Sequence, residues 1–143
     1  MHVQMIRGIL FYMFGRAGGR MMVRTVKWTV FAISVAMAVY STGSALMIAR
    51  AGALNEIDQL AAAGAAETIA GLAFCAAGLV ALWKLWIGAI FHGLNFLWCS
   101  AVAAAYGDVT VWLWCGVAAV LCAVSLLTGW RQRKRQIVSL HSP

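Results

Sequence analysis

Residues 60–82 have the sequence LAAAGAAETIAGLAFCAAGLVAL, an apolar run in which Glu67 is the only charged side chain. An α-helix rises about 1.5 Å per residue, so a run of this length crosses the ~30 Å of hydrocarbon in a bilayer. Polar and apolar residues do not alternate here, as they do in the strands of a membrane β-barrel. Because a segment in lipid must satisfy its own backbone hydrogen bonds, the sequence predicts a transmembrane helix.

Three more apolar runs of similar length flank this one, at residues 28–49, 86–106 and 109–130. None contains a proline, since the only proline is Pro143. The connections are residues 50–59, a tight turn at Lys84 and residues 107–108, and short connections force neighbouring helices to run antiparallel. The sequence therefore predicts an all-α polytopic membrane protein with four transmembrane helices in an antiparallel bundle. One alternative stays open, in which residues 60–106 form one span and a re-entrant segment.

The composition agrees with a membrane protein. Of the 143 residues, 64% are hydrophobic and 10% are charged, against about 45–50% and about 25% in ordinary soluble domains. These values exclude a soluble globular domain, a disordered chain and a disulfide-stapled scaffold. The cysteines lie inside apolar runs without a CxxC pair, which predicts small buried hydrophobic residues. They are Cys75, Cys99, Cys115 and Cys122.

The first 27 residues carry basic side chains and no acid. Apolar residues recur there at helical spacing, and three glycines follow. They are Ile6, Ile9, Leu10, Met13 and Phe14, then Gly15, Gly18 and Gly19. This pattern predicts a short N-terminal interfacial helix over residues 3–14, followed by a glycine hinge. The predicted domains are a basic cytoplasmic segment (1–27), the transmembrane domain (28–130) and a basic cytoplasmic tail (131–143).

The charges indicate the orientation. With four spans, both termini and Lys84 share one side of the membrane, and that side holds every Lys and Arg except Arg50. The positive-inside rule then predicts the bacterial inner (cytoplasmic) membrane, with the N- and C-termini in the cytoplasm. Residues 21–45 also resemble a signal peptide with small residues at 43–45. Cleavage there would leave three spans and would separate the basic ends.

Glu67 is the strongest candidate for a functional residue. It lies about seven residues into its run, or ~10 Å below the outer end, and an acid at the centre of a span costs about 2.5–3.5 kcal/mol. The position favours an interhelical hydrogen bond or a carboxylate that reaches the outer headgroups, and a proton or cation site is the functional alternative. Hydroxyl residues of the first run lie at similar depth and are possible partners for hydrogen bonds. They are Tyr40, Ser41, Thr42 and Ser44.

Small side chains form one stripe beside Glu67 and predict close helix packing, within the chain or between copies. The stripe consists of Gly64, Thr68, Gly71, Cys75 and Gly78. His92 and Asn95 lie one helical turn apart in the third run and are candidates for a polar relay or an interhelical hydrogen bond. A haem would need a second axial histidine, and the others, His2 and His141, lie in the tails. No cofactor is therefore predicted.

Basic residues after the fourth run predict a lipid anchor, because each basic side chain near an anionic surface contributes about 1 kcal/mol. They are Arg131, Arg133, Lys134 and Arg135. The charges flank apolar runs, which argues for the lipid bilayer as partner and against nucleic acid. The sequence has no phosphate-binding loop, metalloprotease or hydrolase motif, so we predict no enzyme activity and no metal.

These features favour a non-enzymatic inner-membrane protein that acts through helix packing. It would be an accessory or assembly subunit of a membrane complex, or an exclusion or immunity protein. Its partner, a membrane protein or a second copy of the chain, would bind through residues 60–82.

Two resemblances give alternatives. Residues 63–67 (AGAAE) resemble the segment with the membrane glutamate in small multidrug resistance transporters, which implies a small proton-coupled transporter using Glu67. That glutamate lies in the first span of the family but in the second span here, and residues 1–27 have no counterpart. The small size, smooth helices and basic C-terminal tail resemble those of phage holins. Met21-Met22, which follows a basic leader, resembles a dual translation start. The resemblance to phage holins implies a holin-like pore-former.

Overall fold

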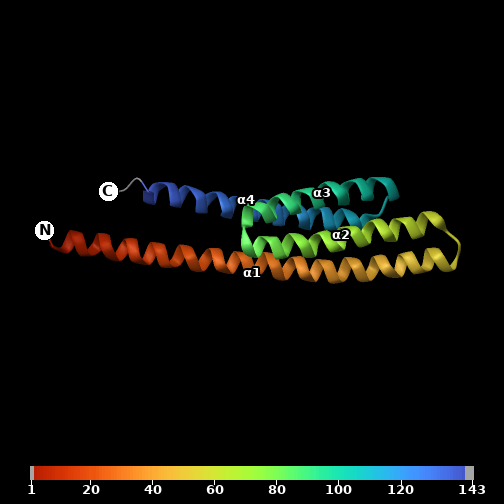
Figure 1. Cartoon of the computed structure of the whole chain (residues 1–143), viewed down its shortest axis with the longest axis horizontal. Helices are drawn as coiled ribbons and strands as arrows, with labels where there is room; N and C mark the ends of the chain where they lie inside the picture. The colour runs from red at the N-terminus through yellow and green to blue at the C-terminus, as the bar shows by residue number, and fades with distance from the viewer. Residues whose placement is uncertain (1, 141–143) are drawn as a thin grey trace.

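The computed structural model describes residues 2–140 and the side chains of residues 21–134. It is all-helical, with the elements α1 (His2–Leu54), α2 (Asp58–Trp83), α3 (Leu85–Tyr106) and α4 (Val109–Leu140) (Figure 1). Each contains a segment long and apolar enough to cross a membrane: Met21–Leu54, Asp58–Trp83, Leu85–Tyr106 and Val109–Lys134. The prediction of an all-α chain with four helices long and apolar enough to cross a membrane is confirmed. Residues 60–106 belong to two helices of membrane-spanning length, which favours two spans over the re-entrant alternative.

The first helix is longer than predicted. It continues through Gly15, Gly18 and Gly19, so the prediction of a hinge is wrong. A glycine inside a helix costs only about 1 kcal/mol relative to alanine, and most residues around these glycines are good helix formers. The side chains of residues 1–20 lie outside the described part, and the interfacial placement of residues 3–14 stays a prediction. At its other end α1 extends to Leu54, beyond the predicted end of the first run.

The other two connections are tight, as predicted. Lys84 has extended backbone angles (φ −138°, ψ 107°) and separates α2 from α3. Gly107 ends α3 in the left-handed region (φ 68°), where its N–H donates to the carbonyl of Ala103. The Asp108 carboxylate then accepts the backbone N–H of Thr110 at 2.6 Å. A glycine C-cap followed by an aspartate N-cap accounts for a turn of two residues.

The glycine stripe of α2 packs against α1 in the same chain. Gly64 lies against Ala49, Gly71 against Thr42 and Gly78 against Ser34. Along this contact, residue numbers therefore increase in α2 in the direction in which they decrease in α1. A Cβ atom on Gly64 would lie 2.5 Å from the backbone nitrogen of Ala49. The two backbones are therefore too close for any side chain larger than hydrogen at this position.

The remaining helices complete a bundle in which α1 packs mainly on α2 and α4 mainly on α3. Between α3 and α4, Ser100 Oγ lies 3.6 Å from Cys115 Sγ, and Gly129 lies against Trp86. The first residues of α1 and the last residues of α4 lie at one end of the molecule, where these two helices extend past α2 and α3 (Figure 1). The α2–α3 connection at Lys84 faces the same end.

A candidate site in the buried polar core

Polar side chains from all four helices are buried inside the bundle. They are Ser34 and Ser41 of α1, Glu67 of α2, His92 and Asn95 of α3, and Ser125 of α4. Each lies three, four or seven residues from buried neighbours on its own helix, so the spacing that builds the apolar core also buries these groups. Buried polar groups cost free energy unless they are partnered, and in a membrane span they mark functional positions. This polar core is the candidate site.

Glu67 lies inside the bundle, with only 2% of its surface exposed. It shares its helix face with Gly64 and Gly71, which the α1 backbone covers. The residue before Glu67 is Ala66, whose carbonyl accepts a hydrogen bond from the indole N–H of Trp98 at 3.0 Å. This bond joins α3 to α2. Among the side chains of residues 21–134, no hydrogen bond or ion pair reaches the Glu67 carboxyl. The structure therefore places an acid in the core without a hydrogen-bond partner among the described side chains.

The hydroxyl groups expected to partner Glu67 do not contact it. The Ser41 hydroxyl donates to the carbonyl of Met37 at 2.6 Å, and the Ser44 hydroxyl donates to the carbonyl of Ser41 at 3.0 Å. Tyr40 is 59% exposed and faces outward. Thr42 packs against Gly71, one helical turn from Glu67. Hydroxyls inside a helix normally donate to the preceding turn, so this expectation is wrong.

His92 is fully buried and makes an interhelical contact. Its Nε2 lies 3.4 Å from Ser34 Oγ, and the Ser34 hydroxyl donates to the carbonyl of Val30 at 2.7 Å. Since Ser34 uses its only proton on Val30, its oxygen accepts in the contact with His92, which assigns the imidazole proton to Nε2. Nδ1 of His92 then carries a lone pair, and this buried atom has no partner among the described residues.

Asn95 differs from the prediction. Its Oδ1 accepts a weak S–H bond from Cys99 at 3.8 Å, so this bond lies within α3 and not between helices. Its Nδ2 is buried without a partner in the described part of the chain, as are Ser125 Oγ and Trp114 Nε1. Buried donors and acceptors of this kind are normally satisfied by a bound water or ligand. The polar core thus has hydrogen-bonding capacity that its own side chains do not use.

Three serines of the core are not predicted correctly from the sequence. Ser34 and Ser125 are not among the candidate residues, and Ser41 is expected to hydrogen-bond with Glu67. Ser34, Ser41 and Ser125 are all buried. Ser34 and Ser41 are seven residues apart and follow the buried positions of Val30 and Ala38. That periodicity is visible in the sequence and is the signal that would have found them.

A lysine caps the end of α2 that faces the chain termini. Lys27 Nζ donates to the carbonyls of Leu82 and Trp83, at 2.8 Å and 3.0 Å. A cation at the C-terminus of a helix pairs with unsatisfied carbonyls and with the negative end of the helix dipole. Lys27 therefore joins α1 to α2, a role that spacing along the sequence did not reveal.

The basic cluster continues the helix α4 past the bundle. The Arg133 guanidinium lies 5.2 Å from the ring centre of Trp86, and the Lys134 ammonium lies 4.2 Å from that of Trp130. Arg131 is exposed, and the side chain of Arg135 lies outside the described part. Cations stacked on indoles are typical of a membrane interface. Anchoring to lipid stays a prediction.

The four cysteines are free thiols, of which Cys99 and Cys115 are buried. Within residues 21–134, no group of three or more His, Cys, Asp or Glu side chains is placed to hold a metal ion. No protein-family model, curated protein or solved structure matches this chain. The functional assignment therefore rests on the geometry of the polar core.

Proposed function

We propose that this chain is a bacterial inner-membrane protein that binds and transfers protons through its polar core, with Glu67 as the principal proton-binding group. Its four spans form an antiparallel bundle with both termini in the cytoplasm. The observation that carries this proposal is the burial of Glu67 (2% exposed) without a partner among the described side chains. A buried carboxylate that lacks a partner costs several kcal/mol. Binding a proton removes that cost, which makes the residue a proton carrier.

The arrangement of the core also supports proton transfer. Trp98 meets Ala66 beside Glu67, and His92 lies near Phe74, with ring centres 6.2 Å apart. Glu67, Asn95 and His92 therefore occupy successive levels of the bundle, spread over about 10 Å at 1.5 Å per residue. The free Nδ1 of His92 is a second proton acceptor at the deeper level. A neutral imidazole in this position is suited to relay a proton.

Proton flux into liposomes tests this proposal. The purified protein is reconstituted with a pH-sensitive dye inside the vesicles, and a membrane potential drives protons inward. We expect flux with the wild type and with E56Q, a control acid in the exposed α1–α2 turn, and loss of flux with E67Q. Wild-type flux no faster than in protein-free vesicles, or equal flux with E67Q, would contradict proton transfer at Glu67. Release of the dye itself would instead support the holin-like alternative.

A second candidate is the accessory or assembly subunit of a membrane complex. The observation that favours it is the shared projection of α1 and α4 beyond the bundle, at the end that carries both termini (Figure 1). Because α1 covers the glycine face of α2, a partner or a second copy would contact the opposite face. Ala65, Ile69, Leu72 and Ala76 are on that face, where Ile69 and Leu72 are exposed. A stoichiometric partner after purification in mild detergent, together with no proton flux, would favour this function.

A further inference from the structure

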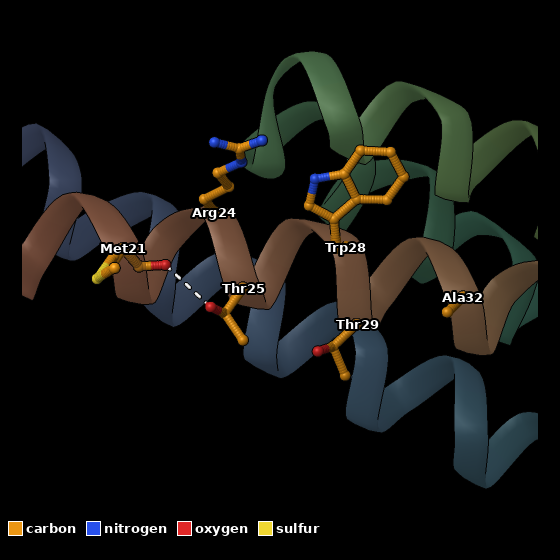
Figure 2. Close-up of a pocket in the computed structure, with 6 residues that line it drawn as sticks. All are labelled: Met21, Arg24, Thr25, Trp28, Thr29 and Ala32. Atoms are coloured by element: carbon orange, nitrogen blue, oxygen red, sulfur yellow. Dashed lines mark hydrogen bonds between the residues drawn. The ribbon is translucent and has the colours of Figure 1, made fainter.

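A shallow hollow lies on α1 close to the end where the chain termini project. Its volume is about 560 Å³, and it is lined by Met21, Arg24, Thr25, Trp28, Thr29 and Ala32. Figure 2 shows Arg24 and Trp28 projecting on one side of the helix and Thr25 and Thr29 on the other. The hollow therefore combines a cation, an indole and two hydroxyls with apolar side chains at its two ends.

The tryptophans place this hollow at the level of lipid headgroups. Trp28, Trp83, Trp86 and Trp130 are all exposed. The bonds from Lys27 to the carbonyls of Leu82 and Trp83 bring Trp28 close to the end of α2, and Gly129 packs on Trp86. Four exposed indoles thus gather at one end of the bundle, as in the aromatic belt of a membrane interface. Lipid phosphates lie at this depth.

No Asp or Glu side chain lies within reach of Arg24. The only acids are Glu56, Asp58, Glu67 and Asp108. Because Gly64 packs on Ala49, Glu67 is level with a part of α1 about 20 residues, or ~30 Å, from Arg24. The other acids lie in or beside the turns at the far end of the bundle. No Asp or Glu side chain therefore pairs with Arg24, and its guanidinium is able to bind an anion from outside the chain.

Three other cations at this end of the bundle have partners within the chain. Lys27 donates to the carbonyls at the end of α2, Arg133 stacks on Trp86 and Lys134 stacks on Trp130. Arg24, in contrast, borders the hollow. A planar guanidinium can bind two oxygens of one phosphate, which gives both charge and geometric fit.

We propose that the hollow binds the headgroup of an anionic phospholipid. The Arg24 guanidinium pairs with the phosphate, and the indole N–H of Trp28, on the same side of the helix (Figure 2), donates to a glycerol or ester oxygen. The Thr25 hydroxyl already donates to the carbonyl of Met21 at 3.0 Å (Figure 2), so its oxygen only accepts. The acyl chains continue past Ala32 along the exposed face of α1. This site is independent of proton binding at Glu67.

Native mass spectrometry of the full chain in mild detergent tests the site, with phosphatidylglycerol as the anionic lipid and phosphatidylcholine as the zwitterionic one. We expect the wild type to retain one phosphatidylglycerol in preference to phosphatidylcholine. R24Q should bind it at least about fivefold more weakly, since one basic contact contributes about 1 kcal/mol. The control R50Q removes the same charge from an exposed position near the opposite end of the bundle and should keep the wild-type affinity. W28F should weaken binding without any change of charge.

Three results would overturn the proposal. Equal losses in R24Q and R50Q would show a general charge effect, and equal retention of both lipids would show no headgroup selectivity. Complete displacement of the lipid by glycerol phosphate would identify a site for soluble phosphates. Thermal melting of each variant in lipid-free detergent checks the fold, and we expect no change for R24Q because Arg24 is exposed.

Discussion

Replacing Gly64 with alanine adds one methyl group at a close backbone contact between α1 and α2. The new Cβ would lie 2.5 Å from the nitrogen and 2.8 Å from the Cα of Ala49, and 2.6 Å from the carbonyl oxygen of Ala45. Ordinary contacts of a Cβ atom are 3.4–4 Å. All three obstacles are backbone atoms, so no side-chain rotation can relieve the clash. The two helices must separate locally by about 1 Å or lose their contact.

The expected effect follows from two opposing terms. Overpacking of a close-packed interior costs about 1–3 kcal/mol, while alanine in place of glycine favours a helix by up to about 1 kcal/mol. Gly43 also lies inside α1, and a Cβ atom added there would have no neighbour within 4 Å. G43A therefore gains the helix-propensity term alone. Because that term cancels between the two variants, G64A should be less stable than G43A by about 1–3 kcal/mol.

The measurement is reversible unfolding in mixed micelles, with increasing dodecyl sulfate and helicity followed by circular dichroism. G43A should unfold at or above the wild-type midpoint, and G64A should unfold below it. If G64A and G43A had the same free energy of unfolding, the glycine face of α2 would not pack on α1. The reasoning about the α1–α2 contact would then be refuted.

The remaining predictions each remove the hydrogen bonds of one side chain and use the same unfolding assay. K27M removes two bonds to the last carbonyls of α2 and should lower stability by about 1 kcal/mol, whereas K84M in the exposed turn should change little; equal effects would contradict the capping role. D108A removes the N-cap of α4 and should cost about 0.5–2 kcal/mol, and an unchanged midpoint would count against the cap. W98F removes the bond to the Ala66 carbonyl and should cost about 1 kcal/mol; a loss no larger than that of W112F, an exposed indole control on α4, would contradict it.

Local signals in the sequence were sufficient to predict most helix ends. Tyr106 ends α3 and Val109 begins α4 as predicted, because the glycine and aspartate between them act on adjacent backbone groups. Lys84 separates α2 from α3 for a similarly local reason. The ends of α1 and α4 were harder, because a helix can continue past the apolar run that suggests it. Leu54 and Leu140 lie in such extensions.

The contacts between helices could not be predicted in the same way. The stripe that contains Gly64 indicated a packing surface. Which residues pack on it depends on the register of α1 against α2. The contact of Ser34 with His92 joins residues 58 positions apart, and no periodicity within one helix specifies such a pair. Glu67 stood out in the sequence as a single charge in an apolar run. Serine is less conspicuous in such a run, and Ser125 was therefore overlooked.

Infrared difference spectroscopy of the protein in lipid bilayers tests most directly whether Glu67 binds and releases a proton inside the bundle. Spectra at acidic and alkaline pH are subtracted for the wild type, E67Q and the control E56Q. The wild type and E56Q should share a carboxyl C=O band that appears on protonation, and E67Q should lack it. Identical difference spectra for the wild type and E67Q would contradict a titrating carboxyl at Glu67 and, with it, the proposed function of the polar core.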